Sequence, residues 1–383
     1  MTKFDVVVVG AGPAGAVAAL VLARAGVPVL LLDRSTFPRD KLCGDTLNPG
    51  TLAALRRLGA AQHADGAGLR IDGMLVTGAG VAVAARYPDG LFGRSVVRRE
   101  LDAALVRLAV DAGAVFEPSV TVRSALLTGE GRARQVSGVS TGSGGAERAI
   151  GARVVIAADG RRSTIAFQLG LARHPVRPRR WAMGAYFDNV GGMSSLGEMH
   201  VRQDGYIGVA PMPGGLTNVC LVRPSQPADT AVGPPDAMLR RAIAADPMLA
   251  GRFADARMVR QPIVLGPLAV DASPNDIAGL LVAGDAAGFV DPMTGDGLRF
   301  AVRGGEFAAA AALQALEHGW THVHAQLDAE RRREFSMKWR FNRSLRALVA
   351  SPAAVSLGGR VAAAVPAALR QVVRYAGDCQ SAH

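Results

Sequence analysis

The segment KLCGD, residues 41–45, places an ammonium group, a thiol and a carboxylate within one short stretch. Lys41 and the nearby Arg39 could lower the thiol pKa of Cys43 and make its sulfur reactive, or Cys43 could pack as a small apolar side chain. Asp45 could donate a proton or be a solvated loop acid. A metal site is not expected, because no further ligands stand at metal-binding spacing around Cys43. Cys43 and Asp45 are therefore candidate catalytic residues with two roles open for each.

A glycine-rich loop stands between a strand pattern, FDVVVVG, and a helix pattern, AGAVAALVLARAG. Gly10, Gly12 and Gly15 have the spacing Gly-x-Gly-x-x-Gly, with Pro13 and Ala14 inside the loop. In such a loop the first glycine permits a tight turn, the second lets a pyrophosphate approach the backbone, and the third lets helix and strand pack closely. The free N–H groups and the dipole of the helix N-terminus favour a phosphate there. The loop predicts a dinucleotide site.

An acid follows this loop at the distance typical of such sites. Asp33 ends the next strand pattern, VPVLLLD, about twenty residues on, where a carboxylate binds a ribose 2′-hydroxyl. A carboxylate at this place argues against a 2′-phosphate, so the ligand is expected to carry an adenosine diphosphate group of the FAD or NAD type. We assign the neighbouring Arg34 to the same site.

Two later segments favour FAD over NAD. VVIAADGRRS places Asp159 and Gly160 directly after a buried strand, and LLVAGDAAGF does the same for Gly284 and Asp285. FAD needs a carboxylate for its ribityl hydroxyls and a helix N-terminus near its ring; Asp285 and the helix start in TGDGLRFA suit these roles. Asp159 could instead be an acid that ends the strand in a turn.

Together these motifs resemble a known family. The ordered set of GAGPAG, ADGRRS and GDAAGFVDPMTGDG, over about the first 310 residues, is similar to the FAD-dependent oxidoreductase superfamily that holds p-hydroxybenzoate hydroxylase-type monooxygenases and flavin-dependent halogenases. FPRDKLCGDTLNP and GFVDPMTGDGLRFAVRGGE are most similar to its geranylgeranyl reductase branch. Many members of that branch have Cys-Gly-Gly where this chain has Cys43, Gly44 and Asp45.

The resemblance implies roles for further residues. Arg98, in the R-x-x-L-D of RRELDAAL, would contact the ribose or pyrophosphate side of FAD; a surface arginine at a helix start is the alternative. Asp285 would hold the ribityl chain. The isoalloxazine ring would be lined by Pro292, Gly295, Asp296 and Gly297, with Lys41, Cys43 and Gly44 beside it. Tyr206, in GYIGVAPMPGG, would be an aromatic residue at the substrate cavity and is our third candidate catalytic residue.

The resemblance also implies an activity. We expect reduced FAD to reduce a double bond of a lipophilic small molecule, with NAD(P)H as a transient electron donor because no second dinucleotide motif is visible. The alternative is an NAD(P)H- and oxygen-dependent monooxygenase that hydroxylates or epoxidises an aromatic, polyketide or isoprenoid substrate. A third hypothesis is a non-catalytic FAD-binding protein. A halogenase is not expected, because the chain has no Trp-x-Trp-x-Ile-Pro segment.

The order of strand and helix patterns predicts an α/β fold. We expect a Rossmann-like FAD-binding domain of the glutathione-reductase type, with a β-meander, an inserted mainly antiparallel β-sheet substrate domain, and C-terminal helices. The expected ranges are 1–70, 95–175 and 268–330 for the FAD-binding domain, 71–94 and 176–267 for the substrate domain, and 331–383 for the C-terminal helices. Within GEMHVRQ, His200 alternates with two charged residues, which predicts a solvated strand face.

Charge and hydropathy limit the partners. The net charge is +11, but only 5% of residues are aromatic and the arginines are dispersed, so nucleic acid is not expected. The helix pattern RRREFSMKWRFNRSLRALV is basic and amphipathic; it could pack with its arginines reaching water, or attach to a membrane surface. We find no signal peptide and no apolar run of the roughly 18 residues that a membrane span needs. This predicts a cytoplasmic protein that is membrane-associated if the C-terminal helix binds lipid, with no prediction of oligomeric state.

Overall fold

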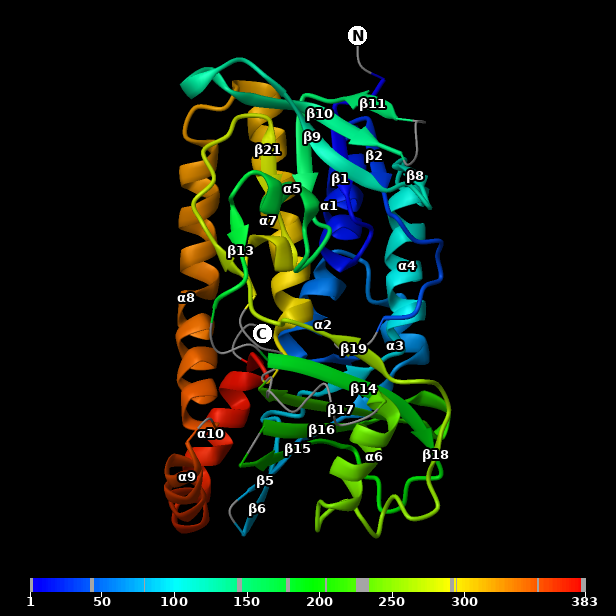
Figure 1. The fold of residues 1–383 in the computed structure, drawn as a ribbon, viewed down its shortest axis with the longest axis vertical. Helices are drawn as coiled ribbons and strands as arrows, with labels where there is room; N and C mark the ends of the chain where they lie inside the picture. Colours follow the sequence, from blue (N-terminus) through cyan, green and yellow to red (C-terminus); the bar gives the residue numbers. More distant parts are fainter. Residues whose placement is uncertain are drawn as a thin grey trace.

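The computed structural model describes residues 3–41, 45–78, 80–142, 147–176, 180–203, 205–224, 234–289, 293, 295–349 and 351–379. A parallel sheet with its helices occupies one end of the long axis, and a larger, mostly antiparallel sheet occupies the other (Figure 1). The C-terminal helices run along one side and end beside the second sheet (Figure 1).

The first sheet consists of five parallel strands whose residues are almost all apolar and buried. Their order is β21 (Leu280–Val282), β12 (Val154–Ala157), β1 (Val6–Val9), β2 (Val29–Leu32) and β8 (Val115–Glu117). Such continuous apolar runs are typical of a parallel sheet that is covered on both faces. In β1, Val6 and Val8 pack on the helical side, whereas Val7 and Val9 pack on the opposite side.

Helices and a small sheet cover the two faces. One face packs against α1 (Pro13–Arg24), α4 (Arg98–Asp111) and α7 (Gly297–His318). The other packs against α5 (Thr164–Gln168) and a meander of β9 (Val122–Thr128), β10 (Gln135–Thr141) and β11 (Arg148–Gly151). The predicted Rossmann-like arrangement with a β-meander is confirmed.

The second sheet combines strands from two distant parts of the chain. Its order is β18 (Arg257–Met258), β14 (Arg180–Asp188), β17 (Thr217–Pro224), β16 (Gly205–Pro211), β15 (Leu196–Arg202), β5 (Gly73–Gly78) and β6 (Val81–Arg86), with β19 (Ile263–Leu265) also paired to β14. Neighbours are antiparallel except β15 and β5, which run parallel. Helix α6 (Pro235–Ala244) contributes to the core on one face, which leaves the other face available to line a cavity.

Shorter elements connect the two sheets. A three-stranded sheet of β3 (Thr46–Leu47), β7 (Gly93–Ser95) and β4 (Leu69–Ile71) lies beside α2 (Pro49–Arg57) and α3 (Gln62–Ala67), and β13 (Ala172–Arg173) pairs with β20 (Asp271–Ala272). Asn48 caps α2, because its side-chain oxygen accepts a hydrogen bond of 2.9 Å from the Thr51 N–H. This cap fixes the segment that follows Asp45.

Three helices complete the fold. α8 (Val323–Val349) runs along α7, and α9 (Pro352–Ala364) and α10 (Pro366–Ala376) turn back against β6 (Figure 1). Pro352 and Pro366 each stand at a first helical position, where the missing N–H leaves no helical bond unmade. Among the described residues, no helix is both long and apolar enough to cross a bilayer.

Candidate FAD site and substrate cavity

The glycine loop is built from close backbone approaches. Gly10 has φ +98°, and a Cβ there would lie 2.5 Å from the Ala158 carbonyl oxygen. A Cβ on Gly15 would lie 1.8 Å from the Gly10 carbonyl oxygen, far inside contact distance. Gly12 precedes Pro13 as the N-cap of α1, and no side chain caps this helix end. The loop therefore presents bare backbone N–H groups, which fits a pyrophosphate.

Asp33 holds this loop in place. Its carboxylate accepts hydrogen bonds of 2.8 Å from the Ala11 N–H and of 2.8 Å from the Ser35 N–H. Each oxygen of a carboxylate can accept more than one hydrogen bond, so the arrangement also suits a ribose hydroxyl. Arg34 is exposed beside it, and its charge acts to lower the pKa of Asp159. The ribose role of Asp33 stays a prediction.

A group of cations surrounds Asp285, which lies in the 3₁₀ turn Gly284–Ala287. Burial raises the pKa of the Asp285 carboxyl, and the charges of Lys41, Arg98 and Arg161 oppose this rise. Burial also lowers the pKa of Lys41, as does the neighbouring charge of Arg98. Several cations beside the half-buried Asp285 suit a ligand that is anionic at its phosphates and carries hydroxyls elsewhere. The residues present thus fit FAD.

Asp102 positions two of the arginines near this group. It is fully buried, and its carboxylate accepts hydrogen bonds of 2.8 and 3.1 Å from the Arg98 guanidinium. Arg39 pairs with the same carboxylate at 3.2 Å. Arg98 is only 6% exposed, so the alternative of a surface arginine is wrong. Asp102 was not among the predicted site residues, although it is the Asp of the R-x-x-L-D segment and stands one helical turn after Arg98.

Asp159 has a structural partner. Its carboxylate accepts a hydrogen bond of 2.8 Å from the Thr164 N–H at the start of α5, and burial raises its pKa. Gly160, with φ +83°, makes the turn after β12. These contacts match the turn-acid alternative for Asp159, and its predicted role at the cofactor stays a prediction.

The loop expected at the flavin ring is fixed by contacts of its Asp296 side chain with other parts of the chain. Gly295 has φ +69°, Asp296 is the N-cap of α7, and Gly297 begins that helix. The Asp296 side chain is buried: its Oδ1 accepts a hydrogen bond of 3.1 Å from Asn48 Nδ2 and pairs with Lys338 at 3.4 Å. Pro292, Cys43 and Gly44 lie outside the described residues.

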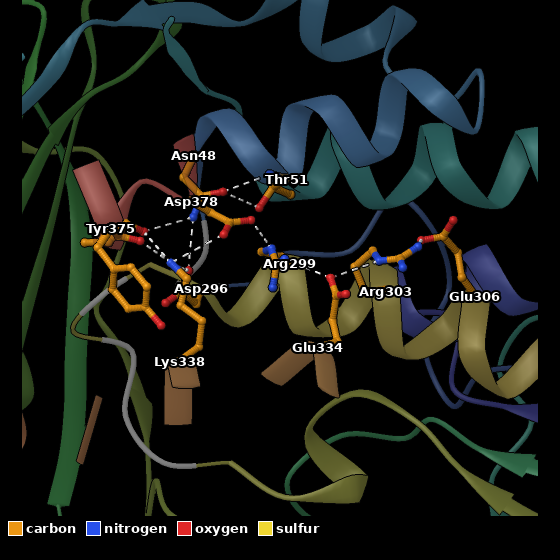
Figure 2. Close-up of polar contacts among 11 residues, drawn as sticks. Asn48, Thr51, Asp296, Arg299, Arg303, Glu306, Glu334, Lys338, Tyr375 and Asp378 are labelled. Carbon is orange, nitrogen blue, oxygen red and sulfur yellow. Dashed lines mark hydrogen bonds and ion pairs between the residues drawn. The ribbon is translucent and has the colours of Figure 1, made fainter. Parts of the chain in front are cut away.

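A chain of charged groups links Asp296 to Asp378, after α10, and continues along α7 (Figure 2). Lys338, on α8, donates to the backbone carbonyls of Tyr375 and Ala376 and lies 3.8 Å from the Asp378 carboxylate. Asp378 also pairs with Arg299 of α7. From Arg299 the contacts continue through Glu334, at 2.8 Å, to Arg303 and Glu306. The network ties the segment that follows α10 to the start of α7.

Asp45 is buried rather than solvated, with 5% of its surface exposed. One carboxylate oxygen accepts hydrogen bonds from the Tyr186 hydroxyl, at 2.8 Å, and from Asn218 Nδ2, at 2.6 Å. The other accepts from the Arg98 N–H at 3.3 Å. Burial raises the pKa of Asp45 to about 6, against these hydrogen bonds. The side chain can therefore hold a proton near neutral pH.

Asp45 also lines a cavity of about 450 Å³. The cavity lies between the second sheet and the C-terminal helices, and most of its wall is apolar. Its lining includes Met74, Val76, Val81, Val83, Met199, Val201, Tyr206, Val222, Met293, Leu345, Leu348, Val355, Val361, Val372 and Val373. Asp45, Asn48 and Gly295 are also in the lining. The predicted ring loop and the candidate acid thus border one apolar space.

Tyr206 and His200 differ in position. Tyr206 is 4% exposed in the cavity wall, so the structure places it at the cavity as the resemblance implied, although its catalytic role stays a prediction. His200 is fully buried and bonds Thr77 and Glu198, each at 2.9 Å. The predicted solvated strand face is wrong there, because strand alternation shows which residues share a face but not whether the face is covered.

Fold and site together define a flavoprotein of the dinucleotide-binding type. The chain belongs to the FAD-binding domain family, whose model matches residues 3–339.

Two characterised relatives are reductases. The menaquinone reductase of Mycolicibacterium smegmatis is 31% identical over 331 residues, which cover 80% of this chain and 76% of the relative. The digeranylgeranylglycerophospholipid reductase 2 of Methanopyrus kandleri is 33% identical over 329 residues, which cover 82% and 78%. The solved structure of the flavin-dependent brominase Bmp2 has a TM-score of 0.83 and 22% identity, with coverage of 98% and 94%, a likeness of fold. The chain is thus an FAD-dependent oxidoreductase related to the geranylgeranyl reductase branch.

Proposed function

We propose that the protein uses reduced FAD to reduce a carbon–carbon double bond of a lipophilic molecule held in the apolar cavity. The observation that carries this proposal is the cavity itself. Its lining is mostly apolar, and it contains Asp45, a buried acid that can be protonated. The wall would bind an apolar substrate by removing its surface from water. The names of the two relatives, which specify menaquinone and a digeranylgeranyl lipid, support a substrate with a long apolar chain.

The residues of the cavity would supply orientation and a proton. FAD, when bound and reduced, supplies hydride. A double bond that gains hydride at one carbon needs a proton at the other, and Asp45 is placed to donate it. Tyr186 and Asn218 fix the carboxyl group from one side, and the Arg98 backbone fixes it from the other. Burial raises the pKa of the Tyr186 hydroxyl, so Tyr186 stays a donor.

The electron donor that we propose is NAD(P)H, bound transiently. Among the described residues, the one Gly-x-Gly-x-x-Gly loop at a strand-to-helix junction is the loop at Gly10, and we assign it to FAD. A nicotinamide donor would therefore reach the flavin without a dinucleotide fold of its own.

The test is anaerobic reduction of the purified, FAD-loaded protein with NADH or NADPH, followed by menaquinone or a geranylgeranyl lipid. We expect the lipid to reoxidise the flavin without oxygen and the product to gain two hydrogen atoms by mass spectrometry. An oxygen-containing product that forms only in air would overturn the proposal in favour of a monooxygenase. Flavin that no tested reductant reduces would overturn it in favour of a non-catalytic FAD protein.

A further inference from the structure

The cavity opens at the C-terminal helices. Three of its lining residues, Leu348 on α8, Val361 on α9 and Val372 on α10, are 40%, 48% and 37% exposed. A residue that lines a cavity and also faces solvent marks its mouth. Asp45, which lines the same cavity, is only 5% exposed. The cavity thus leads from an opening among these helices to the buried acid.

Apolar side chains continue around this mouth. Leu357 is 64% exposed and Val365 is 51% exposed, and neither lines the cavity. The three helices meet, since α9 packs against both α8 and α10, and the C-terminal end of α8 lies with α9 and α10 at one corner of the molecule (Figure 1). Single exposed apolar residues are ordinary, but a group around one opening indicates a binding surface. We call Leu348, Leu357, Val361, Val365 and Val372 the mouth surface.

The helices that carry the mouth surface contribute positive charge, and one acid from elsewhere in the chain, Asp89, lies 3.9 Å from Arg374 of α10. From residue 335 to residue 377 the chain contains no aspartate or glutamate. Arg343 on α8, Arg360 on α9 and Arg370 on α10 are exposed. Lys338 does not add to this surface, because it is buried and contacts Asp296. Apolar side chains with exposed arginines, on helices that have no acid between residues 335 and 377, suit the interface of an anionic bilayer, where apolar groups enter the headgroup region and cations meet lipid phosphates.

We propose that the mouth surface docks the protein on an anionic lipid bilayer, so that the cavity opens toward the membrane. The docking follows from the exposed residues and the charge alone. Passage of a lipid substrate from the bilayer into the cavity rests in addition on the proposed function. A lipid that crosses such a mouth keeps its apolar chain out of water on the way to Asp45, which is the physical advantage of an opening at this place.

The test is flotation of the full-length, FAD-loaded protein with vesicles of phosphatidylcholine alone or with about one third phosphatidylglycerol. We expect binding to the anionic vesicles that weakens at high salt, because exposed charges are screened. The double variant Leu357→Glu/Val365→Glu should lower the partition coefficient at least about tenfold. Arg360→Glu/Arg370→Glu should lower it by a similar factor.

Matched controls change the same residue types elsewhere. Two control variants should bind vesicles like the wild type. Val176→Glu/Val259→Glu changes exposed valines outside the mouth surface. Arg134→Glu/Arg240→Glu changes an exposed arginine just before β10 and another on α6. Retained flavin absorbance and an unchanged melting temperature show that each variant is folded. Flotation needs no turnover, so a failed docking and a failed reductase activity are separate results.

Three outcomes would overturn the proposal: no binding of the wild type to anionic vesicles, equal binding by the mouth-surface and control variants, or self-association without vesicle binding. Self-association is checked by light scattering at several protein concentrations. A dimer that Leu357→Glu/Val365→Glu dissociates would assign the mouth surface to a second copy of the chain.

Discussion

Two regions of this enzyme differ in the atoms that form their contacts. One is the glycine loop at residues 10–15, which we call the phosphate end, and the other is the apolar cavity that Asp45 lines, which we call the cavity end. At the phosphate end, backbone meets backbone: a Cβ on Gly15 would lie 1.8 Å from a carbonyl oxygen, and a Cβ on Gly305 of α7 would lie 2.4 Å from the Ala14 carbonyl oxygen. At the cavity end, side chains such as Met74, Met199 and Leu345 form the wall. Backbone contacts tolerate no added atom, whereas apolar side chains can be exchanged if the volume is kept. The glycine loop therefore selects its ligand through the position of the backbone. The cavity selects its ligand through the volume that the apolar side chains leave open.

The sharpest test of this contrast is Gly15→Ala. The added Cβ would displace the glycine loop, so we expect FAD affinity to fall by more than about a hundredfold, which is more than about 2.7 kcal/mol, or the protein to be insoluble. Bound flavin after purification is the measurement. Gly66→Ala is the control, since a Cβ there meets no atom within 4 Å. Wild-type flavin content in Gly15→Ala would break the comparison.

The network of Figure 2 joins the two ends, and Lys338→Met tests it. The variant removes a buried cation from between Asp296 and Asp378, so we expect a loss of about 3–5 kcal/mol in the free energy of unfolding. Denaturant unfolding measures it. Arg303→Met, at a half-buried arginine of the same network, should lose only about 1 kcal/mol. Equal losses in both variants would mean that the burial of a cation does not determine how much it contributes to the free energy of unfolding.

Asp45→Asn tests the chemistry assigned to the cavity end. Loss of the proton donor should lower turnover about 10²- to 10³-fold and leave FAD affinity unchanged. Because the pKa of Asp45 is about 6, wild-type turnover should fall as the pH rises through 6, and the variant should lose this dependence. Rapid-mixing kinetics across pH 5–9 measure both. Turnover within about threefold of the wild type would remove Asp45 from the mechanism.

The same shift makes a stability prediction. The pKa of Asp45 is higher in the folded state, about 6, than its ordinary value of 3.8. The folded protein therefore binds the Asp45 proton more tightly, and the contribution of Asp45 to the stability of the wild type should fall by up to about 3 kcal/mol as the pH rises from about 4 to about 6. Asp45→Asn lacks this loss, so the difference between the two should grow over that window and stay constant above it. Unfolding at pH 4, 5, 6 and 7 checks the sign.

Tyr186→Phe is the smallest expected change. The Tyr186 hydrogen bond lowers the pKa of Asp45, so its loss should raise that pKa and move the pH dependence of turnover upward. Turnover at the optimum should fall only about threefold to tenfold, the magnitude of one hydrogen bond. A pH profile identical to the wild type would show that Tyr186 does not act on Asp45.

The sequence predicted the geometry of the glycine loop well, because the residues of this loop are close together in the chain. Gly10, Gly12 and Gly15 have a fixed spacing, and the apolar strand before them and Asp33 after them place the loop. The Arg98–Asp102 pair has the local spacing of a helical turn and could have been found in the same way.

At the cavity, the sequence named Asp45 and Tyr206 as candidates but left no local signal for the partners of Asp45. Asp45 bonds Tyr186 and Asn218, which are 141 and 173 residues away in the chain. Spacing along the chain cannot predict these contacts, because Tyr186 and Asn218 reach Asp45 only when the second sheet packs against the segment that contains Asp45. His200 was assigned to the wrong environment for a related reason: the residues that bury it come from more than one part of the chain, including Thr77 of β5.

The parallel pairing of β5 with β15 sets an order of events during synthesis. Gly73 of β5 pairs with Leu196, so the β5–β6 hairpin leaves the ribosome more than a hundred residues before its neighbour exists. Until then, the edge of β5 that will meet β15 has no partner, and the apolar side chains that will form the cavity wall have no cover. At ordinary rates of translation this interval lasts on the order of ten seconds. For that time the future substrate site is a hydrophobic hairpin that a chaperone can recognise.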